Sequence, residues 1–262
     1  MTNALLQPMI DAALEAGKEI EAIYGAGCAT YTKADGSPVT EADHRAEAII
    51  LSALAKAYPD IPVIAEEEAC VGRIPQVGSR FFLVDPLDGT RGFVNRTGEF
   101  TVNIALILDG VATAGVIYVP ESHILYYGEA GAGAFRRDAA GNTQRILARA
   151  RPAEGLTVLA SRTTADRTAR RLSHLNIAEF LPSSSSLKFC LLAEGSADYY
   201  PRLSPTSEWD TAAGHAVLLA AGGRVDGLDG APLAYGKPSF HNPGFAATAG
   251  WQGPRLERFL AV

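Results

Sequence analysis

The stretch "FLVDPLDGTR", residues 82–91, ends an apolar run with two aspartates, Asp85 and Asp88, on either side of a proline. A residue that precedes proline is pushed toward extended geometry, so Asp85 is expected at the very end of a strand. Pro86 then turns the chain without offering an N–H group. Both carboxylates and the Leu87 carbonyl can therefore face one small volume, and such an all-oxygen set suits a hard cation such as Mg²⁺.

Gly89 and Thr90 follow these aspartates directly. At a turn or at the start of a helix, their backbone N–H groups could bind an anion. An ordinary Asp-Pro turn followed by an Asp-Gly turn explains the same residues equally well. The stretch thus has two interpretations, a surface turn and a metal site that holds a phosphate.

Composition narrows the class of protein. The 262 residues are 47% hydrophobic, which predicts a globular fold with a sizeable core. Acidic residues outnumber basic ones by 29 to 23, so the overall charge of −6 disfavours nucleic acid or an anionic membrane as a partner. No apolar run is long enough to span a membrane, and the N-terminus lacks the pattern of a secretory signal. We expect a cytoplasmic protein, and the sequence leaves open both attachment to the inner membrane face and the choice between monomer and homodimer.

Cysteine and histidine chemistry is not indicated. The three cysteines are far apart and form no C-x-x-C pair, which predicts neither a disulfide framework nor a zinc site. The five histidines show no metal-ligand spacing. Any metal chemistry in this chain is therefore expected to depend on oxygen ligands.

Apolar spacing predicts two parts of the chain. Helices are expected at 4–24 and 40–58, with a polar loop at 33–40 between them. Short apolar runs then predict a sheet, in the segments 61–65, 80–85, 101–108, 111–119, 124–128, 133–138 and 144–149. After Pro152 strands and helices alternate, with strands expected at 156–161, 178–181 and 197–201 and helices at 163–174, 187–194 and 209–221. We predict an α+β half over 1–152 and an α/β half over 153–262.

Further acids stand at predicted element boundaries. Glu66, Glu67 and Glu68 follow a strand-like run, and Asp210 opens a predicted helix. A solvated charge run and a helix N-terminal acid are the simpler interpretations of these residues. Two carboxylates about 5 Å apart repel by about 3 kcal/mol at an effective dielectric near 20. Converging acids would therefore need divalent cations between them, and such a cluster could bind a phosphate ester and activate a water.

The order of these motifs resembles the lithium-sensitive, magnesium-dependent phosphomonoesterases related to inositol monophosphatase. The likeness spans about residues 33–245 and rests on Asp43, the "EE" pair at 66–67, "DPLDGT" at 85–90 and "WD" at 209–210 before the pair Gly222-Gly223. Within that superfamily the chain is most similar to bacterial 3'(2'),5'-bisphosphate nucleotidases of the CysQ type. The motifs that carry this second likeness are "GEFTVNIALI" at 98–107, "SSLKFCLLAEG" at 185–195, "YPR" at 200–202, "WDTAAGHAV" at 209–217 and "NPGF" at 242–245.

The resemblance implies a fold, a metal and roles for residues. The fold would be the layered αβαβα sandwich of the sugar phosphatases, and two or three Mg²⁺ ions would occupy the site, with Asp85 bridging two of them. The implied metal ligands are Glu66, Asp85, the Leu87 carbonyl, Asp88 and Asp210. Asp43 and Thr90 would position and deprotonate the attacking water, a step that also involves Glu66 or Glu67. The implied substrate-contacting residues are Leu87, Asp88, Gly89, Thr90, Ser185, Lys188, Arg202 and Asp210.

Substrate recognition is where this chain departs from the nucleotidases. They often have S-R-S-H where this chain has Ser161, Arg162, Thr163 and Thr164, so a histidine that can help to hold the nucleotide is absent. A basic residue such as Lys188 or Arg202 is still expected beside a second phosphate that the metals do not reach. A position on the helix surface is the simpler interpretation of Lys188.

The resemblance implies hydrolysis of the 3'-phosphate of adenosine 3',5'-bisphosphate to AMP and phosphate, a lithium-sensitive reaction that clears a nucleotide left by sulfate assimilation. A phosphatase for inositol phosphates or another sugar phosphate is the alternative within enzymes. A non-catalytic module that binds a metal or nucleotide is the alternative outside them, although Asp43 and Thr90 are not needed merely to hold a metal.

Overall fold

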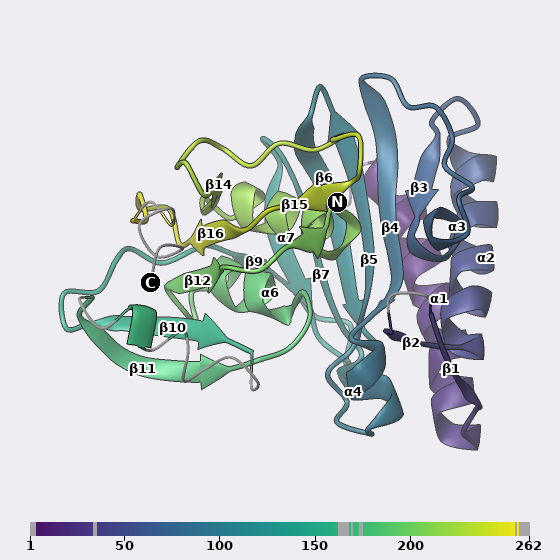
Figure 1. Ribbon diagram of the computed structural model, residues 1–262, viewed down its shortest axis with the longest axis horizontal. Coiled ribbons are helices and arrows are strands. Elements are labelled where there is room, and N and C mark those ends of the chain that lie inside the picture. The colour runs from purple at the N-terminus through teal and green to yellow at the C-terminus, as the bar shows by residue number, and fades with distance from the viewer. Residues whose placement is uncertain are drawn as a thin grey trace.

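The computed structural model describes residues 4–33, 36–161, 168, 170–172, 175–254 and 256. Within these residues, no helix is long and apolar enough to cross a membrane. The chain forms two large sheets with helices between and beside them (Figure 1). The layered arrangement of sheets and helices that the sequence predicted is therefore confirmed.

Two long helices form the first layer. α1 spans Leu6–Ala26 and α2 spans Glu41–Ala57, close to the predicted bounds. Thr40 begins α2 with a capping box, because its Oγ1 accepts from the Ala42 N–H at 3.2 Å and its backbone N–H donates to Asp43 Oδ2 at 2.8 Å. The segment 33–40 was wrongly predicted as loop throughout, since β1 (Thr30–Thr32) pairs with β2 (Pro38–Thr40). Gly36 lies in the connection between these two short strands, and Pro38 begins β2.

The seven-stranded sheet is the second layer, with the order β3-β4-β5-β6-β7-β8-β9. Only β3 and β4 run parallel, and each later neighbour pairs antiparallel. The predicted strands are confirmed with these bounds: β3 Val63–Ala65, β4 Arg80–Asp88, β5 Thr101–Leu108, β6 Val111–Val119, β7 Ile124–Glu129, β8 Gly133–Arg137 and β9 Thr143–Ile146. Short helices α3 (Glu66–Cys70), α4 (Thr90–Val94) and η1 (Pro120–Ser122) lie between them.

The sheet is buried on both faces. Along β5, Val102 and Ile104 pack in one core with α1 and α2, whereas Ala105 and Ile107 pack in a second core with α6 and α7. Successive side chains of a strand point to opposite faces, which explains this division. The strands consequently read as continuous apolar runs in the sequence.

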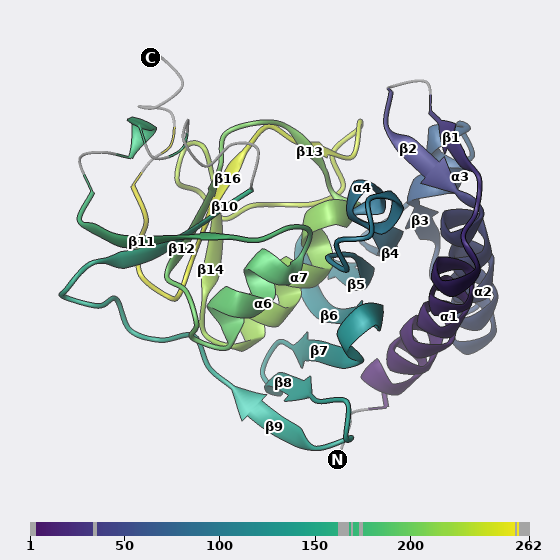
Figure 2. The same ribbon diagram turned by 90° about the horizontal axis from the view of Figure 1, so that it is seen from below.

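Helices α6 (Leu187–Ala193) and α7 (Trp209–Ala220) form the third layer, between the two sheets (Figures 1 and 2). The five-stranded sheet beyond them has the order β11-β10-β12-β16-β14. Its strands are β10 Leu156–Ala160, β11 Ile177–Pro182, β12 Tyr199–Arg202, β14 Arg224–Gly227 and β16 Phe245–Thr248. Two further short strands, β13 (Thr206–Ser207) and β15 (His241–Asn242), pair with each other.

Several predictions in this half have different outcomes. The strands near 156, 178 and 197 and the helices near 187 and 209 are confirmed. β14 and β16 were not predicted. Most of the helix expected at 163–174 lies outside the described residues. Within this range the structure describes Thr168, Arg170 and Arg171 as helical. The chain passes between the sheets from Ile146 to Leu156, and the division into domains at 152 stays a prediction.

Gly115 allows α7 to cross the seven-stranded sheet closely. A Cβ at this position of β6 would lie 2.4 Å from the Ala213 carbonyl oxygen and 2.9 Å from Ala216 Cβ. Both contacts belong to the rigid backbone or to the first side-chain atom of α7, so neither can move aside easily. The absence of a side chain at 115 therefore sets the spacing of the second and third layers.

We expect Gly115→Ala to destabilise the protein by about 1–3 kcal/mol, because the added methyl group overpacks this contact. Gly25→Ala on α1 is the matched control, since no described heavy atom lies within 4 Å of its new Cβ. Urea unfolding of the two variants and the wild type measures the effect. Equal free energies of unfolding for both variants would contradict this account of the packing.

His215 is a buried polar group of α7. Its side chain is 5% exposed, and Nδ1 lies 3.0 Å from the Tyr235 hydroxyl oxygen. Burial lowers the pKa of His215 to about 4, because a charged imidazolium is poorly solvated there. The folded protein thus keeps this ring neutral at pH values where the unfolded chain protonates it.

This pKa shift predicts a pH dependence of stability. The pKa of His215 is lower in the folded protein than the value of about 6.5 in the unfolded chain. The neutral ring therefore contributes its full stabilisation above pH 6.5, and this stabilisation is lost as the pH falls toward 4. Between pH 7 and pH 4, we expect the free energy of unfolding of the wild type to fall by up to about 3 kcal/mol more than that of His215→Gln. Urea unfolding at several pH values measures this difference, with the exposed His44→Gln as control. Parallel curves for the wild type and His215→Gln would refute the assignment.

Candidate active site

The acidic motifs meet because β3 and β4 are parallel neighbours. Ala65 of β3 lies opposite Val84 of β4, so Glu66 and Asp85, which follow them, emerge at the same edge of the sheet. Burial raises the pKa of Asp85 and the charge of Glu66 raises it further, which places the two carboxyl groups close to each other. The interpretation of the glutamates as a purely solvated charge run is therefore wrong for Glu66.

The Asp-Pro motif distorts the end of β4. Asp85 pairs with Asn103 of β5 but Asp88 pairs with Thr101, so β4 holds one extra residue in a bulge. The Leu87 backbone N–H donates to Asp85 Oδ1 at 3.0 Å, which fixes that carboxylate. Gly89 follows with a φ of 94°, and a Cβ there would lie 2.3 Å from Ser185 Oγ. The motif is a built structure rather than a simple surface turn.

Electrostatics shows that four predicted metal ligands face one another. Burial raises the pKa of Asp85 well above its usual value, and the charges of Glu66 and Asp88 raise it further, as does Asp210. Burial and the charge of Asp88 also raise the pKa of Asp210 to about 7. Burial likewise raises the pKa of Glu66 and of Asp88. Each of these groups is held near others of the same charge, at a cost to the fold.

Lys33 partly compensates this charge. Its ammonium lies 2.6 Å from Glu66 Oε1 and 2.6 Å from Glu67 Oε1. Burial would lower the pKa of Lys33, but the two carboxylates outweigh it and raise the pKa. Lys33 therefore remains charged and serves as the counter-ion of the glutamate pair.

Asp43 and Thr90 come together although they are 47 positions apart. Thr90 Oγ1 lies 3.1 Å from Asp43 Oδ1 and 3.1 Å from the Leu87 carbonyl oxygen. Burial raises the pKa of Asp43, against the hydrogen bonds that it accepts from Thr40 and Thr90. The capping box of α2 thus places a buried carboxylate on the hydroxyl at the start of α4.

Ser186 joins the parts of the site that come from different layers. Its backbone N–H and its Oγ donate to Asp88 Oδ2, at 2.8 and 3.2 Å. The same Oγ lies 3.1 Å from the Asp210 carbonyl oxygen and accepts from Asn103 Nδ2 at 2.9 Å. The Asp210 carboxylate in turn accepts from Thr206 Oγ1 and from the Ser207 N–H group. Asp88 and Asp210 are consequently held in one hydrogen-bonded network.

A pocket of about 150 Å³ opens beside these aspartates. Lys188 and Arg202 line it, together with Ser185 and Tyr200. Lys188 is 4% exposed, and its Nζ donates to the carbonyls of Ser183 and Ser185, so the simpler interpretation as a surface lysine is wrong. Arg202 donates to the carbonyls of Ser204 and Pro205. Basic side chains thus stand next to the acidic cluster, as a second phosphate would require.

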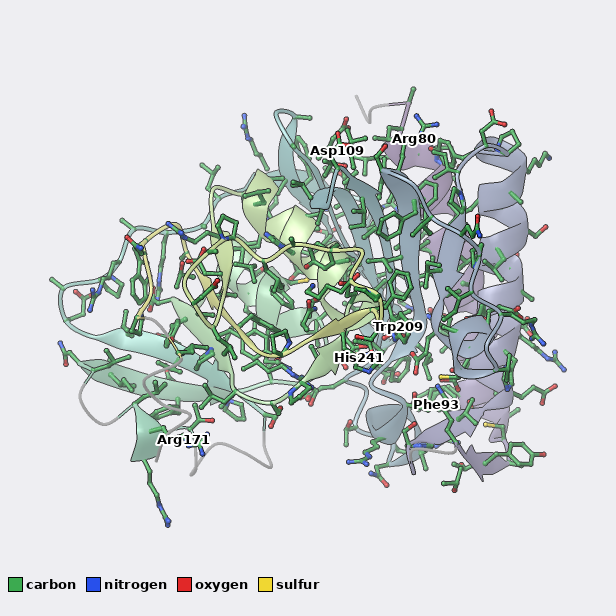
Figure 3. The ribbon with its side chains drawn as sticks, turned by 45° about the horizontal axis from the view of Figure 1, so that its top comes forward. Arg80, Phe93, Asp109, Arg171, Trp209 and His241 are labelled. Atoms are coloured by element: carbon green, nitrogen blue, oxygen red, sulfur yellow. The ribbon has the colours of Figure 1, made fainter. Side chains whose placement is uncertain are left out.

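Trp209 is the residue next to Asp210 at the start of α7. Figure 3 labels it together with Phe93 of the short helix α4. The strand before it, β13, pairs with β15, where Ser207 lies opposite His241. The Glu208 N–H donates to the Phe240 carbonyl at 2.7 Å, which ties the start of α7 to the segment before β15. The position of Asp210 thus depends on Phe240, which lies 30 residues further along the chain.

The donor atoms suit a hard cation. The predicted ligands offer carboxylate and carbonyl oxygens only, the set that Mg²⁺ prefers. Among the described residues, no three acidic, histidine or cysteine side chains form a group that could hold a metal ion as it stands. The glutamates instead face Lys33. Besides burial, the charges of neighbouring acids nonetheless raise the pKa of Asp85 and Asp210, and a divalent cation would neutralise this concentration of negative charge.

Sequence reasoning missed several residues of this site. Lys33 fell in a predicted loop, and Ser186 and Asn103 were noted only as letters of longer motifs. Glu47, one helical turn after Asp43, gave a signal in its spacing that was not used. Thr164, which stands where the nucleotidases often have a histidine, lies outside the described residues, as do Arg162 and Thr163.

Comparison with known proteins agrees with this geometry. The family model described as "Inositol monophosphatase family" matches residues 2–254. The chain is 44% identical to the 3'(2'),5'-bisphosphate nucleotidase CysQ of Salmonella typhimurium, over 93% of this chain and 99% of that protein. It is 46% identical to the protein of the same name from Escherichia coli K12, over 82% of this chain and 86% of the relative.

Solved structures show the same fold. CysQ from Bacteroides thetaiotaomicron, a bacterial member of the inositol monophosphatase family, superposes with a TM-score of 0.78 at 37% identity, covering 95% of this chain and 97% of that one. The extragenic suppressor protein suhB from Bartonella henselae gives a TM-score of 0.79 at 28% identity, covering 98% of each chain. The family match over almost the whole sequence, together with the assembled acidic site, shows that this chain belongs to the inositol monophosphatase family.

Proposed function

We propose that this chain is a magnesium-dependent 3'(2'),5'-bisphosphate nucleotidase that releases the 3'-phosphate of adenosine 3',5'-bisphosphate. The observation that carries the proposal is the acidic cluster of Asp85, Asp88 and Asp210 beside a pocket lined by Lys188 and Arg202. Relatives that are 44–46% identical bear the name of this activity. The reaction would clear a nucleotide that sulfate assimilation leaves as a by-product.

The metal would be held by Glu66, Asp85, the Leu87 carbonyl, Asp88 and Asp210. When bound, Mg²⁺ would neutralise the charge of the transferred phosphate and lower the pKa of a water. Asp85 is central among these ligands, because it is the acid on which burial and the other three charges act together. The number of ions, two or three by resemblance, stays a prediction.

Thr90 and Asp43 would orient the attacking water. The Thr90 hydroxyl has one proton, and Asp43 Oδ1 and the Leu87 carbonyl both compete for it at 3.1 Å. A hydroxyl held in this way keeps a lone pair that can accept a hydrogen bond from water, and the carboxylate behind it can take up the proton. Glu66 or Glu67 would assist, and the amides of Gly89 and Thr90 would bind the phosphate.

Substrate choice would depend on the basic side of the pocket. Lys188 uses two of its three N–H groups on carbonyl oxygens, which leaves one for a ligand. Arg202 lies near Asp88 and Asp210, so its charge reaches the acidic cluster. Ser185 lines the same pocket. These three residues would bind the nucleotide or its second phosphate.

The alternatives remain distinguishable by experiment. A phosphatase for inositol or sugar phosphates would share the metal cluster but would have less need of Lys188 and Arg202. A non-catalytic binding module would leave the contact between Asp43 and Thr90 without a purpose. Cytoplasmic location, attachment to the inner membrane face, and the choice between monomer and homodimer stay predictions.

Asp85→Asn tests the metal cluster. We expect turnover to fall by about 1,000-fold or more, since losing about 4 kcal/mol of charge stabilisation has that effect. The melting temperature without Mg²⁺ should equal or exceed that of the wild type, because the substitution removes a buried repulsive charge. Phosphate release and thermal unfolding measure the two effects. Full activity, or loss of folding, would count against the assignment.

A comparison of substrates tests the reaction. Phosphate release is measured from adenosine 3',5'-bisphosphate and from inositol 1-phosphate, with and without Mg²⁺ and with millimolar Li⁺. We expect Mg²⁺-dependent, Li⁺-inhibited release that favours the nucleotide, because the basic side chains of the pocket match its second phosphate. Preference for inositol 1-phosphate would overturn the substrate, and release that needs no metal would overturn the mechanism.

A further inference from the structure

Glu47 is a buried carboxylate for which the proposed reaction has no assigned role. It lies on α2 four residues after Asp43, and its side chain is 3% exposed. Residues at this spacing share one face of a helix. The face of α2 that presents Asp43 to Thr90 therefore also presents Glu47 to the neighbouring part of the site.

The partners of Glu47 are backbone N–H groups of α3. Glu47 Oε2 accepts from the Glu67 N–H at 2.8 Å, and Oε1 accepts from the Glu68 N–H at 3.0 Å. The first N–H groups of a helix have no acceptor within it, and Ala65, the residue before α3, has no side chain that could supply one. Glu47 fills this position from a different helix with both of its oxygens.

These two hydrogen bonds set the direction in which each glutamate of α3 points. Glu66 and Glu67 face inward, where both contact Lys33. Glu68 points outward and pairs with Arg73 at the surface. A rotation of α3 about its axis would exchange these directions, and Glu47 opposes such a rotation because it binds two consecutive N–H groups.

Fold stability alone accounts poorly for an acid at this place. A neutral side chain would add no charge here, whereas Glu47 brings another negative charge close to Glu67 and Glu68. The carboxylate has two equivalent acceptors that can satisfy both N–H groups at once, which an amide side chain cannot do. A carboxylate at position 47 therefore orients α3 more precisely than an amide would, at the cost of an added negative charge.

We propose that Glu47 is a positioning residue that orients α3, so that Glu66 faces Asp85 in the arrangement that binds Mg²⁺. The role rests on the proposed function, because Glu66 is a ligand only in that proposal. Hydrogen bonds that orient a metal ligand commonly contribute 10- to 100-fold to metal affinity or activity. One face of α2 then holds both the water-orienting pair and the glutamate ligand in place.

Calorimetric titration of the substrate-free protein with Mg²⁺ tests this role directly. We expect Glu47→Gln to weaken Mg²⁺ binding about 10- to 100-fold, because glutamine offers one acceptor in place of two. Glu41→Gln is the matched control, since it makes the same change on the same helix at a side chain that is 53% exposed. We expect its Mg²⁺ affinity to stay within about twofold of the wild type, as for surface substitutions generally.

Glu47→Asp separates geometry from charge. It keeps the negative charge, but its shorter side chain cannot reach both N–H groups, so we expect a loss of Mg²⁺ affinity similar to that of Glu47→Gln. Wild-type affinity in Glu47→Asp would show that charge alone matters and would overturn the positioning role. Wild-type affinity in Glu47→Gln would overturn it as well. If Glu47→Gln does not fold, the Mg²⁺ affinity of Glu47→Asp decides the question in the same way.

The proposed function can fail separately from this inference. A wild-type protein that binds no Mg²⁺ would overturn both. A wild-type protein that binds Mg²⁺ and hydrolyses another phosphate ester would change the substrate only and would leave the role of Glu47 intact. Wild-type binding and turnover with no difference between Glu47→Gln and Glu41→Gln would overturn the role of Glu47 alone.

Discussion

Repulsion among buried carboxylates at the end of β4 is the constraint on which the rest of this structure depends. Glu66, Asp85, Asp88 and Asp210 come from three segments, α3, β4 and α7. Burial raises the pKa of all four, and repulsion among them raises the pKa of Asp85 and Asp210 further. A fold can keep such a group together only if other contacts oppose its dispersal. The surrounding hydrogen bonds supply this opposition, since backbone amides, hydroxyls and one lysine hold the acids individually.

The layers of the fold serve this arrangement. The parallel pair β3 and β4 brings Glu66 beside Asp85, and the bulge at Pro86 directs Asp88 toward the helices of the third layer. Close packing of α7 against β6 at Gly115 then fixes the helix that carries Asp210 in its first turn. Errors in layer spacing would therefore reach the site directly, because its ligands are attached to elements of different layers.

The sequence predicted most of this, and its failures have physical causes. Long periodic segments such as α1, α2 and β4–β7 were predicted because both of their faces are defined by packing. β14 and β16 were missed because β14 has a single apolar residue, Val225, and β16 is half alanine, which is disfavoured in strands. The metal-site acids were found through local motifs. Glu47 and Ser186 act through backbone N–H groups or carboxylates 20 and 98 positions away, and such contacts exist only once the chain is folded.

The bridge from Ser186 to Asp88 and Asp210 has a consequence for how the molecule unfolds. Asp88 belongs to the seven-stranded sheet, Ser186 precedes α6 and Asp210 lies on α7, so the bridge crosses from one layer to the next. A cation that engages both aspartates would stabilise the association of these layers, by an amount that grows with its concentration relative to its dissociation constant. Resistance to proteolysis would then increase with the supply of the cation in the cell, because the bound ion would hold two layers of the fold together.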